Sequence, residues 1–238
     1  MRIMLIGYGK MGKAIEQIAL KRGHTVPVII DMNNGTDLKK ITSKDVDAAI
    51  EFTQPESAFE NIKQCIENGI PVASGTTGWL EKKPEIEALA KTKGGAFFYA
   101  SNYSVGVNLF FHLSKYLARI MNAHPEYEVA TEEIHHTAKK DAPSGTGITL
   151  AEGIIEQIDR KKNWVNHETK NGSELSILSK RIDPYPGEHT VVYSSAIDNI
   201  EIKHTAHSRE GFATGAVVAA EFIAGKKGVF GMEDMLKF

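Results

Sequence analysis

The N-terminal part of the chain alternates short apolar runs with segments whose apolar positions recur at helical spacing. This alternation is typical of βαβ units, in which parallel strands are connected by helices. We expect strands over residues 2–7, 25–31, 48–53, 70–74 and 96–100, and helices over residues 11–22, 56–67 and 84–91. The pattern predicts an α/β fold with a Rossmann-like, doubly wound parallel sheet, in which residues 32–45 form a short connector.

The pattern changes after residue 104, where a long apolar helix is expected over residues 105–121 and the later strands are longer. Residues 191–196 and 200–205 alternate around a polar turn and predict an antiparallel hairpin. These features indicate a second, α+β domain, with the polar segment 161–173 as a flexible loop. A helix over residues 216–224 is expected to return to the first domain. The predicted domains are residues 1–104 with 211–238, and residues 105–210.

A glycine-rich turn, Gly7-Tyr8-Gly9-Lys10-Met11-Gly12, joins the first strand to the first helix. Its first two glycines allow a pyrophosphate to approach backbone N–H groups, and Gly12 allows close helix packing. Asp31 closes the next strand about twenty residues later, where a carboxylate accepts hydrogen bonds from ribose. A glycine turn without a ligand is the alternative. We predict that the cofactor is bound by Gly7, Gly9, Lys10, Met11, Gly12 and Asp31.

Asp31 also bears on which nicotinamide cofactor is bound. Its carboxylate repels a 2′-phosphate, and Met32-Asn33-Asn34 follow it where an arginine would be needed to accept that phosphate. NADH is therefore favoured over NADPH, although use of both is not excluded.

Further polar turns follow the later strands of the predicted sheet. Ligands bind at the carboxyl ends of such strands, so hydroxyl and backbone groups there are suited to the nicotinamide. Phe52-Thr53 is a weaker candidate of the same kind, and all of these segments have ordinary turns as their alternative. The additional predicted cofactor residues are Gly75, Thr76, Thr77, Ala100, Ser101, Asn102 and Tyr103.

The densest group of chemically active residues lies between a strand-like run and the helix that follows it. His135 and His136 end the strand, and Lys139 follows with a charge suited to a carboxylate. Consecutive strand residues point to opposite faces, so both histidines reach one pocket only at an irregular strand end. A surface or packing role is the alternative for each of them. One of Glu132 and Glu133 is expected to orient a histidine.

The same segment continues into Pro143-Ser144-Gly145-Thr146, which predicts a helix start with outward-facing N–H groups. The N–H groups of Gly145 and Thr146 can bind a second carboxylate besides the one that pairs with Lys139, so the expected substrate is a small dicarboxylate. The histidines and Lys139 are candidate proton donors. We predict no metal, because the sequence has no cysteine cluster and no HExxH run.

Composition excludes several other classes of protein. The formal net charge is −2 without a basic stripe, which argues against nucleic acid as a partner. The single cysteine, Cys65, cannot form an intramolecular disulfide. No apolar run approaches the length of a membrane span or of a signal segment. We therefore expect a cytoplasmic protein without membrane contact.

Four segments of the chain together resemble the 4-hydroxy-tetrahydrodipicolinate reductase family. They are the glycine turn, the Gly75-Thr76-Thr77-Gly78 turn, residues 100–108 and the segment His135-His136-x-x-Lys139-x-Asp141-Ala142-Pro143-Ser144-Gly145-Thr146. The resemblance implies reduction of 4-hydroxy-tetrahydrodipicolinate by NADH or NADPH, with loss of water, on the diaminopimelate route to lysine. It implies catalytic proton transfer by His135 and Lys139, substrate contacts by His136, Lys139, Ser144, Gly145 and Thr146, and the cofactor residues named above. It also implies a homotetramer built through the hairpin at residues 191–205.

Two other functions remain open at this point. Another two-domain nicotinamide dehydrogenase, such as an aspartate dehydrogenase, explains the first domain equally well. A regulator that senses NAD(H) without turnover does so too, but has no use for Lys139 beside His135. Glycines at the two crossings between the domains, near Ser104 and Arg209, also predict a hinge.

Overall fold

The computed structural model describes residues 1–208 and 210–237, and the chain divides into two compact units. Unit 1 comprises Met1–Val105 and Glu210–Phe238, and unit 2 comprises Gly106–Arg209. These limits differ from the predicted domains by one residue at each crossing. Arg209, one of the predicted hinge positions, lies outside the described residues, as does Phe238. The hinge therefore stays a prediction.

The centre of unit 1 is a six-stranded sheet in the order β11-β5-β4-β3-β1-β2, and all of its strand pairs are parallel. Its strands are β1 (Arg2–Ile6), β2 (Thr25–Ile30), β3 (Ala48–Glu51), β4 (Val72–Ser74), β5 (Ala96–Tyr99) and β11 (Gly228–Phe230). Chain order reverses between β1 and β3, so β1 leads outward to β2 on one side and β3 leads to β4 and β5 on the other. Ligands bind such sheets at the carboxyl ends of the strands beside this reversal.

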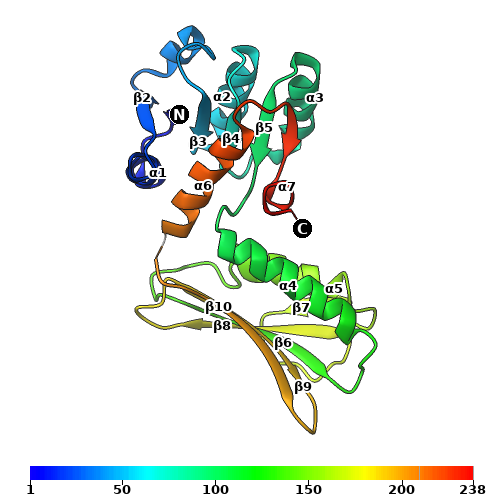
Figure 1. Cartoon of the computed structure of the whole chain (residues 1–238). Coiled ribbons are helices and arrows are strands. Elements are labelled where there is room, and N and C mark those ends of the chain that lie inside the picture. The colour runs from blue at the N-terminus through cyan, green and yellow to red at the C-terminus, as the bar shows by residue number, and fades with distance from the viewer. Residues whose placement is uncertain (209, 238) are drawn as a thin grey trace. The chain divides into compact units, whose positions relative to one another are not determined.

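Helices cover both faces of this sheet, as Figure 1 shows. One face packs on α1 (Lys10–Lys21), α6 (Glu210–Ile223) and α7 (Met232–Leu236). The other face packs on α2 (Pro55–Glu67) and α3 (Lys83–Lys93), with short 3-10 turns at η1 (Gly35–Lys40) and η2 (Leu80–Lys82). The predicted doubly wound, Rossmann-like fold is confirmed.

Unit 2 has a five-stranded mixed sheet in the order β10-β9-β6-β8-β7. Its strands are β6 (Glu128–His135), β7 (Asn163–Val165), β8 (Glu174–Arg181), β9 (Gly187–Ser194) and β10 (Asn199–Ala206). The β9–β10 pair is antiparallel, as the hairpin prediction requires, whereas β6, β8 and β7 run parallel. The helices α4 (Val105–Met121) and α5 (Gly145–Ile155) pack on one face of the sheet (Figure 1).

One prediction about a connecting segment is wrong in part. The polar segment 161–173, expected to be a flexible loop, contains β7. Lys161 is buried, and its ammonium bonds the Glu128 carboxylate and the carbonyl of Glu174, which ties the segment to β6 and β8. Residues 32–45 connect β2 to β3 as predicted, and they contain η1, whose Leu38 joins the core of unit 1. Buried anchors therefore order segments that look featureless by composition.

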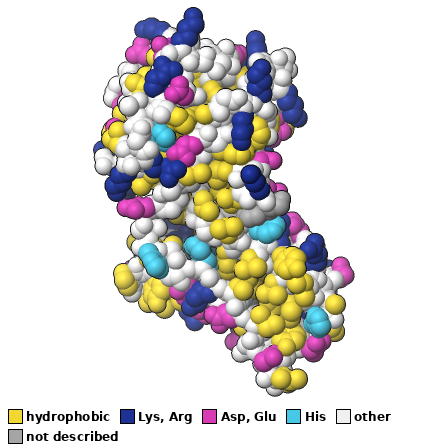
Figure 2. Space-filling view, in the orientation of Figure 1, with side chains coloured by type: hydrophobic (Ala, Val, Ile, Leu, Met, Phe, Trp, Pro, Cys, Tyr) yellow, Lys and Arg dark blue, Asp and Glu magenta, His cyan; other side chains and the backbone are white. Residues whose placement is uncertain are grey.

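The outer surface of α4 carries the largest run of exposed apolar side chains on any one helix among the described residues. Leu109, Leu113, Tyr116 and Ile120 recur at helical spacing and are each 45–50 % exposed. Figure 2 shows apolar side chains gathered over this part of unit 2. Within residues 1–208 and 210–237, every helix falls short of the length and apolar character that crossing a membrane requires.

Candidate functional site

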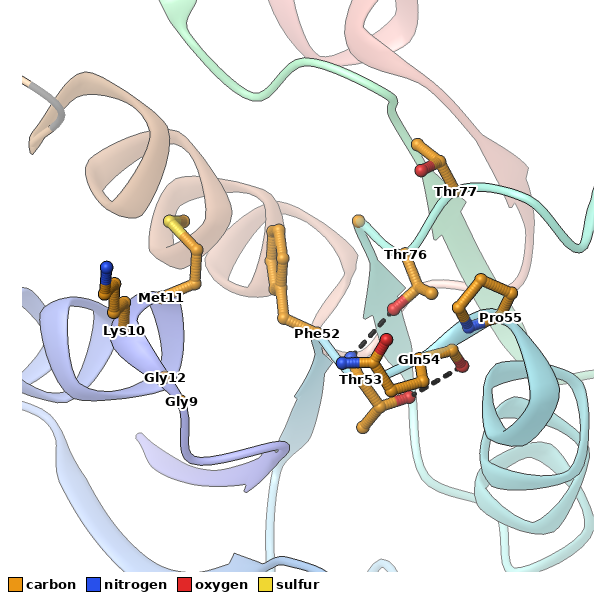
Figure 3. Close-up of a pocket in the computed structure, with 11 residues that line it drawn as sticks. Gly9, Lys10, Met11, Gly12, Phe52, Thr53, Gln54, Pro55, Thr76 and Thr77 are labelled. Carbon is orange, nitrogen blue, oxygen red and sulfur yellow. Dashed lines mark hydrogen bonds between the residues drawn. The ribbon is translucent and has the colours of Figure 1, made fainter. Parts of the chain in front are cut away.

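A pocket of about 630 Å³ opens at the carboxyl ends of β1, β3 and β4. This is the position beside the chain reversal where the sheet topology predicts a ligand. Figure 3 shows the Thr76 hydroxyl directed at the Thr53 N–H, which donates to it at 2.8 Å and links the turns after β3 and β4. The pocket is lined by Gly9, Lys10, Met11, Gly12, Phe52, Thr53, Gln54, Pro55, Gly75, Thr76 and Thr77.

Three glycines at or beside this pocket have no room for a side chain. A Cβ at Gly7, where φ is +93°, would lie 1.9 Å from the Phe52 carbonyl oxygen. A Cβ at Gly12 would lie 2.2 Å from the Gly7 carbonyl oxygen, and one at Gly75 would lie 2.2 Å from the Phe52 ring. Helix α1 begins after Gly9 without a side-chain cap, so its first N–H groups suit a pyrophosphate. The residues present therefore fit a dinucleotide.

A fully buried carboxylate, Glu51, lies beneath the pocket at the end of β3. It accepts hydrogen bonds from the Ser74 hydroxyl at 2.6 Å, the Thr76 hydroxyl at 2.8 Å and the Thr53 N–H at 3.0 Å, as well as from the Thr53 hydroxyl. Burial raises the pKa of the Glu51 carboxyl, and these hydrogen bonds only partly offset the effect. Glu51 thus fixes two threonines that line the pocket.

The remaining predicted cofactor residues lie near the same edge of the sheet but do not line the pocket. Asp31 directly follows β2, and one of its oxygens accepts a hydrogen bond from the Asn33 N–H at 2.7 Å. Ser101 is exposed and Asn102 half-buried after β5, while Ala100 is buried.

Tyr103 differs from these residues because it belongs to the core. Its ring stacks on Phe98, with centroids 5.7 Å apart, and its hydroxyl donates to the Ser74 carbonyl at 2.8 Å. The side chain is 2 % exposed. A direct cofactor contact by Tyr103 therefore involves its backbone and not its ring.

In unit 2, Glu133 lies at the centre of a cluster between β6 and the start of α5. It is 1 % exposed, and it accepts hydrogen bonds from the Ser144 hydroxyl at 2.5 Å and the Ser144 N–H at 3.0 Å. Ser144 in turn caps α5 by accepting from the Gly147 N–H at 2.9 Å. A Cβ at Gly147 would lie 2.6 Å from Glu133, so only glycine fits there. Ser144 therefore positions the helix start through Glu133.

The charge state of Glu133 follows from its neighbours. Burial alone raises the pKa of its carboxyl, but hydrogen bonds, above all those with Ser144 and Ser179, outweigh burial and hold that pKa below its ordinary value. The Arg181 guanidinium also donates to Glu133 at 3.3 Å. Glu132 instead pairs with Lys180 at 2.5 Å. Glu133 is thus the carboxylate directed at the histidines.

His135 ends β6 and is 8 % exposed. Its Nδ1 lies 3.4 Å from the Pro186 carbonyl oxygen, and its Nε2 lies 3.8 Å from the Glu133 carboxylate. Burial lowers the pKa of His135, the charge of Glu133 opposes that effect, and the charge of Lys139 adds to it. The imidazole is therefore neutral near pH 7 in the free protein.

The other predicted residues surround this histidine. Lys139 pairs with Asp141 at 2.8 Å, and Arg181 donates to the Asp141 carbonyl at 2.5 Å, which ties this loop to β8. His136 is half-buried directly after β6. The N–H groups of the first residues of α5 have no partner within the helix. Those residues are Gly145, which is exposed, and Thr146, which is half-buried.

Within the part of the chain that the structure describes, one group of histidine and carboxylate atoms is close enough to hold a metal ion. Atoms of Glu133, His135 and His189 lie within 4.8 Å of one another. However, Ser144 and the cation Arg181 already donate to Glu133, and such donors compete with a metal. We assign no metal to this cluster.

Sequence reasoning did not place Glu51, Arg181 or His189 in the candidate site. Glu51 has one sequence signal, a carboxylate at the end of an otherwise apolar strand, directly before a polar turn. His189 and Arg181 are brought to Glu133 and His135 by strand pairing across long sequence separations. No short sequence motif indicates which residues of these strands pair with one another.

Two features define the class of this protein as a two-domain, dinucleotide-dependent oxidoreductase. They are the glycine pocket at the switch point of a parallel sheet and the histidine–lysine cluster in an α+β unit.

Comparison with known proteins identifies the family within this class. The dihydrodipicolinate reductase N-terminal and C-terminal domain families match residues 1–103 and 106–236. The chain is 47% identical over 236 residues to the 4-hydroxy-tetrahydrodipicolinate reductase of Christiangramia forsetii, covering 99% of this chain and 98% of that relative. It is 35% identical over 199 residues to the same enzyme of Methanoregula boonei, covering 82% and 77%. The chain belongs to the dihydrodipicolinate reductase family, and the resemblance predicted from its motifs is confirmed.

A solved structure agrees at the level of fold. The dipicolinate-bound dihydrodipicolinate reductase from Paenisporosarcina sp. TG-14 matches with a TM-score of 0.76 and 21% identity, covering 97% of each chain. The chain is thus a reductase of the lysine and diaminopimelate route that uses a nicotinamide dinucleotide.

Proposed function

We propose that this reductase converts 4-hydroxy-tetrahydrodipicolinate to tetrahydrodipicolinate with loss of water, and that its chemistry is divided between the two units. Unit 1 binds the dinucleotide, and unit 2 binds the dicarboxylate and supplies the proton. The observation that carries this division is the cluster of His135, Lys139 and the α5 N-terminus within one unit.

The substrate carboxylates match the positive groups of unit 2. Lys139 holds one of them in exchange for its exposed partner Asp141, with His136 beside it. The N–H groups of Gly145 and Thr146 hold the other at the start of α5. Ser144 acts through its bond to Glu133, which fixes this helix start.

Proton delivery is assigned to His135 and Lys139. Once the substrate has lost its 4-hydroxyl group as water, C4 of the resulting conjugated ring can accept the hydride that a bound nicotinamide would supply, and negative charge is then left on the ring. A proton from one of these two groups neutralises that charge. The dianionic substrate favours the protonated form of His135, because a nearby negative charge raises the pKa of an imidazole.

The dinucleotide is held by the glycine turn and by the turns after β3, β4 and β5. We place the pyrophosphate at Gly9 to Gly12 and the nicotinamide near Thr76, Thr77 and the turn at Ala100 to Tyr103. Asp31 accepts from the adenosine ribose, so NADH is favoured over NADPH. A 2′-phosphate would meet the carboxylate without an arginine beside it.

We also propose a cytoplasmic homotetramer assembled through the sheet of unit 2. Val191 and Tyr193 point into the core, so Val192 points to the face that α4 and α5 leave uncovered. Light scattering tests this: Val192→Glu should lower the native mass, whereas Leu113→Glu on exposed α4 should not. A monomeric parent protein, or dissociation only by Leu113→Glu, would contradict the assignment.

A coupled assay tests the function directly. Purified protein receives the product of dihydrodipicolinate synthase together with NADH, and oxidation is followed by absorbance. Substrate-dependent oxidation is expected. Reduction of NAD⁺ by aspartate or another amino acid, without oxidation of NADH by the synthase product, would favour a different dehydrogenase, and NADH binding without turnover of either kind would favour a sensor.

A further inference from the structure

Glu133 and His189 form a cross-strand pair in the buried interior of unit 2. They lie directly opposite each other in the antiparallel β6–β9 pairing, and they are 1 % and 4 % exposed. His135 lies two residues further along β6 on the same face, because side chains on a strand alternate. The three side chains therefore converge although more than fifty residues separate His135 from His189.

The polar atoms of this group face one another without forming hydrogen bonds. His135 Nε2 lies 3.8 Å and His189 Nδ1 lies 4.0 Å from the same Glu133 oxygen, Oε2. The two rings are edge to face, with centroids 5.1 Å apart. Both nitrogens are buried, and neither has a hydrogen-bond partner. Unsatisfied buried polar atoms are costly, so their convergence calls for a functional explanation.

The tautomer of His135 follows from its other nitrogen. A carbonyl oxygen only accepts hydrogen bonds, so the Nδ1 that faces Pro186 carries a hydrogen. The proton that His135 gains or loses is therefore on Nε2, the atom that faces Glu133 and His189.

The surrounding charges allow this cluster one extra proton. Glu133 carries one negative charge and forms an ion pair with Arg181. Lys139, on the loop after β6, carries a positive charge that lowers the pKa of His135. Burial together with the charge of His135 lowers the pKa of His189 to about 4, and His204 on β10 acts in the same direction. His189 is thus neutral at pH 7 and can accept a hydrogen bond at Nδ1.

We propose that His189 is a positioning residue whose neutral Nδ1, together with Glu133 Oε2, stabilises the Nε2 proton of His135. This inference rests on the proposed role of His135 in proton delivery. Delivery requires the imidazole to turn about its Cβ–Cγ bond. Gly187 leaves space beside the ring for that turn, because a Cβ there would lie 3.0 Å from His135 Cε1.

Two substitutions of His189 form a matched pair. Asn places a polar atom near the position of Nδ1, whereas Gln places one near the position of Nε2 and leaves the Nδ1 position apolar. Both are polar and neutral, so their costs to folding are similar. The pKa of His135, measured by nitrogen NMR in each variant, should fall by about one unit in His189→Gln and by much less in His189→Asn.

The alkaline limb of kcat should follow that pKa, because protonated His135 is then lost at lower pH. His204→Gln is the control, since His204 lies opposite His189 on β10 but its ring contacts Phe110. That variant should leave the pKa of His135 near its parent value. Circular dichroism of all three variants establishes that they are folded.

The results separate this inference from the proposed function. An unchanged His135 pKa in His189→Gln, or equal shifts in the Asn and Gln variants, would overturn the inference and leave the function intact. A shifted pKa without a shifted kcat limb would support the inference and remove His135 as the proton donor. A stoichiometric divalent metal in the purified enzyme, lost in both variants, would replace the inference with a metal site.

Discussion

Each unit of this reductase buries one glutamate beneath its candidate site, and the two glutamates have opposite electrostatic surroundings. Glu51 in unit 1 is bonded by neutral groups of Ser74, Thr53 and Thr76, and burial raises its pKa. Glu133 in unit 2 has Arg181 and histidines around it as well as Ser144, and its pKa is lowered.

The difference indicates what each carboxylate does. Neutral hydroxyl groups give Glu51 fixed geometry, so it shapes the turns that line the cofactor pocket. Hydrogen bonds with Ser144 keep Glu133 ionised, and its negative charge favours a proton on an adjacent imidazole. One unit is thus organised to hold a ligand and the other to move a proton.

The largest expected effect tests this division through Lys139. Lys139→Ala should lower kcat by about a thousandfold, as loss of a proton donor and a carboxylate partner does. NADH affinity, measured by fluorescence, should stay unchanged because the dinucleotide pocket lies in unit 1. Lys140→Ala removes the neighbouring exposed charge as the control. Collapse of NADH binding in Lys139→Ala would contradict the division.

The two glutamates themselves give the second prediction, in urea unfolding at pH 7. Glu133→Gln should destabilise the protein by about 2 kcal/mol, because the half-buried Arg181 and the hydroxyl of Ser144 lose a charged hydrogen-bond acceptor. Glu51→Gln should change stability by less than about 1 kcal/mol, since the surrounding hydroxyls can also accept hydrogen bonds.

The contributions of Glu133 and Glu51 to the free energy of unfolding should change with pH in opposite directions. The pKa of Glu133 is lower in the folded protein than in the unfolded chain. Its contribution to stability is therefore present above the unfolded pKa and is lost as the pH falls through the folded pKa. The folded pKa of Glu51 is raised, so its ionisation costs stability as pH rises from the unfolded toward the folded value. Equal losses of stability in Glu133→Gln and Glu51→Gln, at pH 7 and again at pH 5, would contradict the electrostatic difference between the two glutamates.

Gly75→Ala should have an intermediate effect confined to unit 1. The added Cβ would lie 2.2 Å from the Phe52 ring and force that ring into the pocket. Overpacking of this kind costs about 2 kcal/mol, or roughly thirtyfold in the Kd for NADH. Gly35→Ala, where a Cβ meets nothing within 4 Å, is the matched control. Similar affinities in the two variants would argue against the pocket as the dinucleotide site.

The smallest expected effect concerns the choice of cofactor. Asp31→Asn keeps a ribose acceptor but removes the charge that repels a 2′-phosphate, so the NADPH-to-NADH ratio of kcat/KM should rise about tenfold. Asp37→Asn, an exposed carboxylate paired with Lys40, should leave the ratio near that of the parent. A ratio that does not change in Asp31→Asn would remove Asp31 from nucleotide selection.

Local patterns predict much of this fold. The glycine turn places β1 before α1, and alternation around residues 197–199 produces the β9–β10 hairpin. The short strand β11 was not predicted, because its few half-buried residues form a strand only by pairing with β5. β7 was not predicted for the same reason, because it forms a strand by pairing with β8 next to the buried Lys161.

The candidate site was predictable where its residues are consecutive. His135, Lys139 and the start of α5 follow one another along the chain, so their chemistry is legible as a motif. His189 and Arg181 were not, because they reach the cluster through the register of β9 and β8 with β6. The hydroxyls of Ser144 and Tyr103 bond Glu133 and the Ser74 carbonyl, and no local sequence pattern indicates these two bonds.

The central claim is that the charged cluster of unit 2 prepares a neutral imidazole to take up one proton when a dicarboxylate binds. Calorimetry of pyridine-2,6-dicarboxylate binding near pH 7.5, in buffers of different ionisation enthalpy, measures that uptake. The account predicts uptake of about one proton per site, lost in His135→Gln, because the ligand raises the pKa of His135. Binding of the same ligand with no proton uptake by the parent enzyme would contradict it.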